Sequence, residues 1–222
     1  MRFLSDFLKK RTLQRETNFL ANCQVLIRGI DEGYNTLKTP IRKCYFLHKI
    51  LESRSPSSIL ELGSGTTTLL FADYTKRNPK ATVETCEHNP KWHEAVDKLL
   101  DTDRIRYNLI SMVDLGESTE YETQYSGNYD FIYIDGPPTA KKYNTDFVKV
   151  LDQSTLKTIV VDERFSTAQK VVEELINRNI QHQVFWSENF PKDILAKIKP
   201  SEFSSQKPHL DDRHTVIYLE NI

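Results

Sequence analysis

The sequence predicts a doubly wound α/β fold in which helices cover both faces of a seven-stranded, mostly parallel sheet. From residue 57 onward, short apolar runs rich in β-branched and aromatic residues alternate with segments of helical spacing. This alternation is typical of parallel strands joined by helices. The runs are apolar on both faces, as strands are when helices cover a sheet on both sides. Right-handed crossover connections then place helices on both faces.

Residues 1–56 precede this pattern and are predicted to form an N-terminal helical extension. Apolar residues follow helical spacing from Phe3 to Ile30, turn residues mark a loop at 31–40, and a second helix is expected from Ile41 to Leu51. The apolar stripe packs on its own domain, joins two copies of the chain in a homo-oligomer, or lies on a membrane surface. These three alternatives stay open at this stage.

Residues 57–222 are predicted to form one domain, with ligands bound beyond the carboxyl ends of its strands. The polar segment at 187–213 is an insert that acts as a lid over a binding pocket or covers a sheet edge. Helices are expected in TTTLLFADYTKR, PKWHEAVDKLL, YNTDFVKVLD and TAQKVVEELINR. The expected strands are residues 58–62, 82–87, 105–110, 129–135, 158–162, 183–186 and 215–219.

The composition argues against several classes of function. The chain has 30 basic and 31 acidic residues, so its net charge of −1 gives no general attraction to nucleic acid or to an anionic membrane. No apolar run reaches the roughly 18 residues that a membrane-spanning helix needs. The cysteines, Cys23, Cys44 and Cys86, lack the spacing of a metal site and indicate reduced thiols. We therefore expect a cytoplasmic protein without a membrane span that does not bind nucleic acid.

The stretch ILELGSGTTT carries a charge where a buried strand should be apolar. Glu61 stands two positions before Gly63, at the tip of the first strand. A carboxylate there accepts hydrogen bonds from a cationic amine of a ligand, directly or through water. Gly63 and Gly65 allow the backbone to approach that ligand closely. The dinucleotide-binding pattern GxGxxG would place its third glycine where Thr68 stands, so this turn alone is weak support for a dinucleotide site.

Glu87 ends the second strand, about 20 residues after Gly65, at the spacing where nucleotide-binding folds place an acid on the ribose. Asn89 and Pro90 have the residue types of a helix N-cap and a first helical position, which places Glu87 at the carboxyl end of its strand. Together with Glu61, this acid predicts a site for a nucleoside that carries an ammonium group.

The motifs ELGSGT, ETCEHNP and YDFIYIDGPP together resemble class I methyltransferases that use S-adenosylmethionine. The resemblance implies a Rossmann-like domain whose last strand, TVIYL, is antiparallel. It also implies that Glu61 and the glycines lie along the methionine part of the cofactor, that Glu87 holds the ribose, and that the loop at Ser111 and Met112 meets the adenine. Thr67 stands where the family often has a third glycine. The expected cofactor-binding residues are Glu61, Gly63, Ser64, Gly65, Thr67, Glu87, His88, Ser111, Met112 and Asp135.

Asp135 is the expected catalytic residue, because methyl transfer to a hydroxyl group needs a proton acceptor or a metal ion. It follows the apolar strand FIYI, next to the expected position of the methyl group. Asp162 and Glu163 end the next strand, and three carboxylates beyond the sheet would suit Mg²⁺. This arrangement resembles the catechol-type O-methyltransferases, with Glu163 in place of their amide. Alternatively, Asp162 or Glu163 pairs with Arg164 or caps the following helix.

The predicted function is transfer of a methyl group from S-adenosylmethionine to an oxygen of a small molecule, such as a sugar or a secondary metabolite. Gly136 and Thr139 depart from the motif that DNA amino-methyltransferases carry after the fourth strand, which argues against nucleic acid. Two alternatives remain. One is a methyltransferase that acts on a protein or on a nitrogen atom, and the other is a nucleotide-binding module without catalysis.

Overall fold

The structure is a computed structural model that describes residues 19–31, 41–136, 142–162, 164–185 and 214–219. The strands of its main sheet are β1 (Ser58–Leu62), β2 (Thr82–Glu87), β3 (Ile105–Leu109), β6 (Phe131–Ile134), β8 (Thr158–Asp162), β9 (His182–Phe185) and β10 (His214–Leu219). They lie in the order β3-β2-β1-β6-β8-β10-β9. Within this described sheet, β10 alone runs antiparallel to its neighbours. The predicted seven-stranded sheet with an antiparallel last strand is therefore confirmed.

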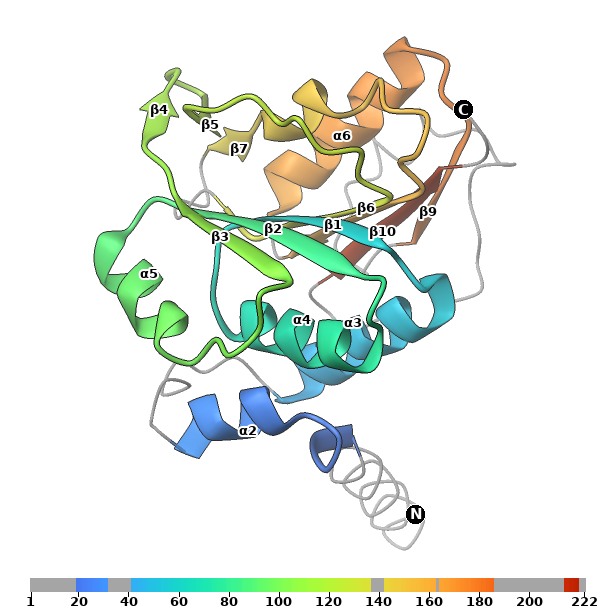
Figure 1. Cartoon of the computed structure of the whole chain (residues 1–222). Helices are drawn as coiled ribbons and strands as arrows, with labels where there is room; N and C mark the ends of the chain where they lie inside the picture. The colour runs from blue at the N-terminus through green and yellow to red at the C-terminus, as the bar shows by residue number, and fades with distance from the viewer. Residues whose placement is uncertain (1–18, 32–40, 137–141, 163, 186–213, 220–222) are drawn as a thin grey trace, which may run out of the picture.

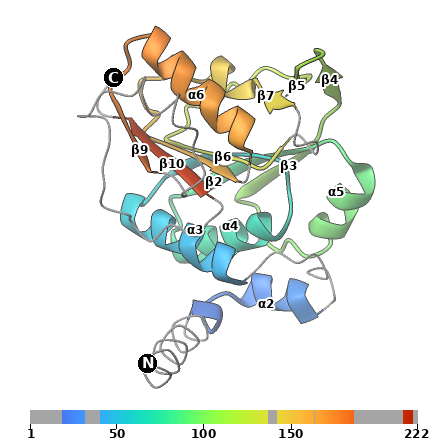
Figure 2. The same ribbon diagram turned by 180° about the vertical axis from the view of Figure 1, so that it is seen from behind.

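Helices cover both faces of the sheet, as Figure 1 and Figure 2 show. One face carries α3 (Ile41–Arg54), α4 (Thr66–Arg77) and α5 (Pro90–Asp97). The other face carries α6 (Phe165–Asn177) and a second, three-stranded sheet of β4 (Met112–Asp114), β5 (Ser118–Tyr121) and β7 (Tyr143–Asn144). The fold is therefore doubly wound, as the alternating pattern predicts.

In the strands of the main sheet other than β2 and β3, neighbouring residues belong to two separate cores. In β1, Ile59 packs in the core that includes α3 and α4, whereas Leu60 packs in the core that includes α6. Both side chains are fully buried. Successive side chains of a strand point to opposite faces of the sheet, so a strand between two helical layers has to be apolar on both. Each such side chain contributes about 1.5–3 kcal/mol on burial.

The described part of the N-terminal extension is helical, as predicted. It comprises α2 (Gln24–Asp31) and α3. The carboxylate of Asp73 on α4 accepts hydrogen bonds from the backbone N–H groups of Val25 and Leu26, at 3.0 and 2.9 Å, and so satisfies donors in the first turn of α2. Residues 1–18 and 32–40 lie outside the described residues, as does the insert at 187–213. None of the described helices is long and apolar enough to cross a membrane.

The prediction of a helix in YNTDFVKVLD is wrong. This segment contains the short strand β7 and a 3₁₀ turn, η1 (Asp146–Lys149). Asn144 Oδ1 accepts a hydrogen bond of 2.8 Å from Asp146 N, and the Asp146 carboxylate accepts bonds from Tyr121 N and from Tyr125 Oη. Side chains that bond to nearby backbone groups compete with the helix for those groups. Here they tie the segment to β5 instead.

Candidate active site

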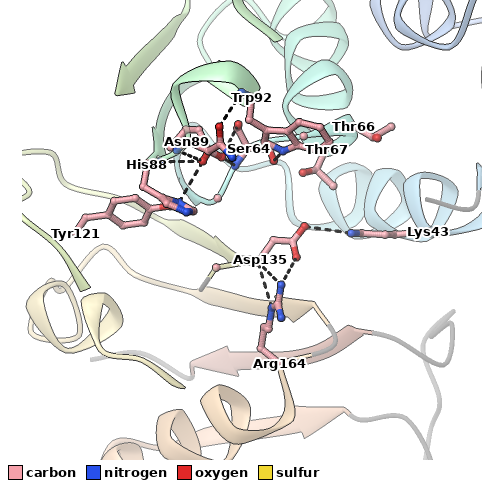
Figure 3. A pocket seen from close by; sticks show the side chains of 14 residues that line it. Lys43, Ser64, Thr66, Thr67, His88, Asn89, Trp92, Tyr121, Asp135 and Arg164 are labelled. Carbon is pink, nitrogen blue, oxygen red and sulfur yellow. Dashed lines mark hydrogen bonds and ion pairs between the residues drawn. The ribbon is translucent and has the colours of Figure 1, made fainter. Parts of the chain in front are cut away.

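A cavity of about 460 Å³ opens at the carboxyl ends of β1, β2 and β6 (Figure 3). The strand order reverses at this point, because the chain builds β2 and β3 on one side of β1 and β6 and β8 on the other. Open α/β sheets bind their ligands at this reversal, and the volume lies in the range of small-molecule sites, about 300–1,000 Å³. The lining residues are Lys43, Gly63, Ser64, Gly65, Thr66, Thr67, Glu87, His88, Asn89, Trp92, Tyr121, Asp135, Gly136 and Arg164.

Two glycines shape the turn between β1 and α4 on the cavity wall. Gly63 has a φ of +92°, in the left-handed region, and a Cβ at this position would lie 3.0 Å from the backbone nitrogen of Gly136. Only glycine adopts this conformation without strain. At Gly65, no atom of the described residues lies within 4 Å of the position that a Cβ would take. The backbone at Gly65 is therefore open to a ligand in the cavity.

Glu61 lies beneath this turn and does not line the cavity. Its side chain is fully buried, and its carboxylate accepts hydrogen bonds from Thr67 Oγ1 at 2.7 Å and Thr85 Oγ1 at 2.9 Å. Burial raises the pKa of Glu61 to about 8, although the hydrogen bonds from threonine hydroxyl groups oppose the rise. The structure therefore accounts for the charged residue in the strand as a brace between β1, β2 and the start of α4.

Glu87 ends β2 on the cavity wall, and both of its carboxylate oxygens accept hydrogen bonds. Oε2 accepts from Ser64 N at 3.0 Å and from Ser64 Oγ at 2.8 Å. Oε1 accepts from the backbone N–H groups of His88 at 2.8 Å and Asn89 at 2.7 Å. Asn89 is the N-cap of α5, as predicted, and its Oδ1 accepts from Lys91 N at 3.0 Å. These contacts fix the Glu87 carboxylate between the glycine turn and α5.

Asp135 follows β6, and its side chain is 28% exposed at the cavity wall. Burial and the Asp162 carboxylate raise the pKa of Asp135 to about 6, while the cations of Lys43 and Arg164 oppose the rise. Lys43 Nζ lies 3.4 Å from Asp135 Oδ2. Arg164 donates hydrogen bonds of 3.2 and 3.1 Å to the main-chain oxygen of Asp135, as Figure 3 shows. A carboxylate with this pKa is ionised at neutral pH yet basic enough to accept a proton.

Comparison with protein families identifies the chemistry of this fold. Residues 60–162 match the family described as a methyltransferase domain, so the match runs from β1 to the end of β8 and includes every lining residue except Lys43 and Arg164. The region from β1 to β8 is therefore a methyltransferase domain. No curated protein matched the sequence.

Solved structures share the fold of this methyltransferase at low sequence identity. One is a Klebsiella pneumoniae protein assigned as an O-methyltransferase, with 14% identity, a TM-score of 0.55, and 90% of this chain and 89% of that chain covered. Another is the O-methyltransferase from Bacillus cereus in complex with S-adenosylhomocysteine, with 14% identity, a TM-score of 0.53 and 89% of each chain covered. A third is TomG from Streptomyces achromogenes in complex with S-adenosylmethionine, with 12% identity, a TM-score of 0.51, and 90% of this chain and 88% of that chain covered.

The residues around the cavity of this methyltransferase fit S-adenosylmethionine. The open space at Gly65 lets a ligand approach the backbone, and the Glu87 carboxylate offers acceptors for ribose hydroxyl groups. A carboxylate has about four lone-pair positions, and donors of the protein already occupy Glu87. The Ser64 hydroxyl group, which also accepts a bond of 2.7 Å from Tyr107 Oη, is the donor that can rotate away from Glu87.

The residues do not fit the predicted magnesium ion. Lys43 Nζ lies between the carboxylates of Asp135 and Asp162 and forms an ion pair with each. An ammonium group in this position satisfies the two carboxylates that the ion would need. Glu163, the third predicted ligand, lies outside the described residues. Within the described residues no group of three His, Cys, Asp or Glu side chains has the arrangement of a metal site. The described residues therefore do not support Asp135 and Asp162 as ligands of a magnesium ion.

The remaining predicted cofactor residues divide into two groups. Thr67 and His88 line the cavity, and His88 Nδ1 lies 3.2 Å from Glu87 Oε1. Ser111 and Met112 are not among the lining residues. Met112 belongs to β4, and the backbone oxygen of Ser111 accepts a hydrogen bond from the backbone N–H of Glu122. The cavity wall that faces the small sheet is formed by Tyr121 of β5.

Several lining residues were not predicted from the sequence. For Trp92 the sequence favours a core role over a place in an aromatic wall of the site. In the structure Trp92 lines the cavity, and its Nε1 donates a hydrogen bond of 3.0 Å to Ser64 O. Tyr121 lies in a strand that carries no clear sequence signal. Arg164 follows Asp162 and Glu163 in the sequence, which predicts an ion pair with one of these acids but no place in the cavity wall. For Lys43 the local sequence offers no signal, since it follows Arg42 in the first turn of α3.

Proposed function

We propose that this methyltransferase transfers the methyl group of S-adenosylmethionine to an oxygen atom of a small molecule, with Asp135 as the general base. The observation that carries the proposal is the Asp135 carboxylate, which lines the cavity next to the glycine turn and has a pKa near 6. An alcohol or phenol has to lose a proton as it is methylated. Similar folds named as O-methyltransferases make an oxygen acceptor the first chemistry to test.

When bound, S-adenosylmethionine supplies an electrophilic methyl group on a sulfonium. In the proposed arrangement Glu87 accepts hydrogen bonds from the ribose hydroxyl groups, while the backbone at Gly65 borders the ligand. Glu61 holds Thr67 and thereby the start of α4 in place. The chain contributes mainly by orienting the acceptor and excluding water, which accounts for much of the catalysis of displacement reactions. Asp135 receives the proton of the acceptor hydroxyl group as the new C–O bond forms.

The proposal is tested by incubating the full chain with S-adenosylmethionine and a panel of phenols, catechols, hydroxy acids and sugars, and by screening for products that gain one methyl group in a mass spectrometer. We expect at least one hydroxyl compound to be methylated, and Asp135→Asn to lower kcat by about 100-fold or more. Methylation of amines only, with Asp135→Asn as active as the wild type, would contradict the proposal and favour a nitrogen acceptor.

A further inference from the structure

Lys43 reaches the cavity from the N-terminal extension and is deeply buried there. Its side chain is 6% exposed, and that of its partner Asp162 is 2% exposed. A buried ammonium group is costly unless charged partners surround it. Burial alone would lower the pKa of Lys43, but the carboxylates of Asp135 and Asp162 together raise it above its usual value. Lys43 is therefore a permanent cation at the cavity wall.

The placement of Lys43 is fixed by the packing of α3 along β8. Lys43 at the start of α3 pairs with Asp162 at the carboxyl end of β8. Arg54 at the end of the helix donates a hydrogen bond of 3.1 Å from its Nε to Thr158 Oγ1, at the beginning of the same strand. The helix thus runs antiparallel to the strand and is attached to it at both ends, so the ammonium group is held at the cavity rather than delivered by a flexible loop.

We propose that Lys43 is a built-in cation of the active site that takes the place of a divalent metal ion between Asp135 and Asp162. The chemical role of Lys43 in this inference rests on the proposed function. The test of the inference measures Mn²⁺ binding and does not depend on that function. An ammonium group has three donors, and two point to the carboxylates. Because Lys43 lines the cavity beside Asp135, the third donor remains for the acceptor oxygen in this proposal.

The proposed step balances without a metal ion. The acceptor hydroxyl group gives its proton to the Asp135 carboxylate, its oxygen bonds to the methyl carbon, and the electron pair of the breaking C–S bond goes to sulfur. Lys43 keeps its proton throughout and stabilises the negative charge that develops on the acceptor oxygen, as a fixed cation does in a site shielded from water. Asp162 holds Lys43 in position and does not contact the reacting atoms.

The inference is tested with Mn²⁺, whose electron paramagnetic resonance signal changes when it binds to a protein. The full-length wild type, Lys43→Met and the control Lys49→Met, from the same helix, are titrated with Mn²⁺ at neutral pH, with circular dichroism as the check of folding. We expect wild type and control to leave the signal of free Mn²⁺ unchanged. Lys43→Met leaves the Asp162 carboxylate without its cation and Asp135 with Arg164 alone. We therefore expect this variant to bind Mn²⁺ about tenfold or more tightly than the wild type.

Two results would overturn the inference. One is stoichiometric Mn²⁺ binding by the wild type that Asp162→Asn abolishes, and the other is a Lys43 variant that binds Mn²⁺ no better than the wild type. If Lys43→Met does not fold, Lys43→Gln keeps a hydrogen-bond donor and serves in the same comparison. Calorimetry with S-adenosylhomocysteine on the same samples separates this outcome from a failure of the proposed function, because absence of cofactor binding would leave the Mn²⁺ result unaffected.

Discussion

Three carboxyl groups near the cavity have the same chemistry and different environments. Glu61 is fully buried and bonded to threonine hydroxyl groups, Glu87 accepts backbone N–H bonds at the cavity wall, and Asp135 lies between two cations. These environments assign them different tasks, since burial favours the neutral acid and nearby positive charge favours the carboxylate. Glu61 braces the turn. In the proposed function, Glu87 holds the ribose and Asp135 accepts the proton.

The pKa of Glu61 predicts how stability depends on pH. Its pKa is raised from 4.5 in the unfolded chain to about 8 in the folded protein, so the folded state holds a proton that the unfolded state releases. The free energy of unfolding should therefore fall as the pH rises between these two values, by up to about 1.4 kcal/mol per pH unit. Glu61→Gln removes this contribution. Urea denaturation of both proteins across this range measures it, and parallel curves for the two would contradict the assignment.

The pKa of Asp135 predicts how activity depends on pH. With a pKa of about 6, Asp135 is ionised and able to accept a proton above that pH, and it becomes protonated below it. We expect kcat for a hydroxyl acceptor to fall about tenfold per pH unit below the pKa. Asp130→Asn is a matched control, because Asp130 lies at the opposite end of β6 and bonds to Ser57 and Ser58. A rate that stays constant through pH 6 in the wild type would show that another group accepts the proton.

At the level of single residues, the sequence predicted positions in the fold better than contacts. Glu87 was placed correctly at the carboxyl end of its strand because Asn89 and Pro90 start a helix immediately afterwards. The burial of Glu61 beneath the turn depends on Thr85 of another strand, which the local sequence does not show. Lys43 resembles Lys49 in sequence, and only the packing of α3 on β8 distinguishes the buried cation from its neighbour.

The glycine turn between β1 and α4 shapes the cavity wall, and substitutions at its two glycines should affect different properties: stability at Gly63 and ligand binding at Gly65. Gly63→Ala places a Cβ at a φ of +92° and 3.0 Å from Gly136 N, so we expect a loss of about 1–3 kcal/mol in the free energy of unfolding. Gly65→Val points into open space, so we expect a change below about 1 kcal/mol in stability but at least about tenfold weaker binding of S-adenosylhomocysteine.

Thermal unfolding and calorimetric titration of both glycine variants separate the two effects. If Gly65→Val bound the nucleoside as tightly as the wild type, the ligand would not lie against this turn. If Gly63→Ala were as stable as the wild type, the turn would be able to relax without the contact between Gly63 and Gly136.

Secondary structure was predictable where apolar pattern determines it. All seven strands of the main sheet were expected, because each is a short run between turn residues, and the central strands β1, β6 and β8 are buried on both faces. The second sheet was not expected, since β4 and β5 are short and partly polar. The false helix at β7 and η1 arose because Asn144 and Asp146 bond to local backbone and to β5, which a count of apolar spacing does not detect.

At the level of the whole molecule, the cavity follows from the topology. A parallel sheet brings the carboxyl ends of β1, β2 and β6 to one edge, and the reversal of strand order next to β1 leaves space there. The sequence therefore predicted where the cavity lies. It did not predict that the N-terminal extension contributes to the same site through Lys43 of α3. The domain boundary expected after residue 56 separates the N-terminal extension from the rest of the chain, yet residues of both parts line the same cavity.

The central claim is that this cavity binds S-adenosylmethionine with Glu87 on the ribose. Isothermal titration calorimetry with S-adenosylhomocysteine tests it most directly, on the wild type, Glu87→Gln and the control Glu84→Gln. Glu84 lies on the same strand but bonds to Tyr129 and Asn108, away from the cavity. We expect one nucleoside bound per wild-type chain, about tenfold or more weaker binding in Glu87→Gln, and unchanged binding in Glu84→Gln. Binding of NAD in place of S-adenosylhomocysteine, or equal losses in both variants, would contradict the claim.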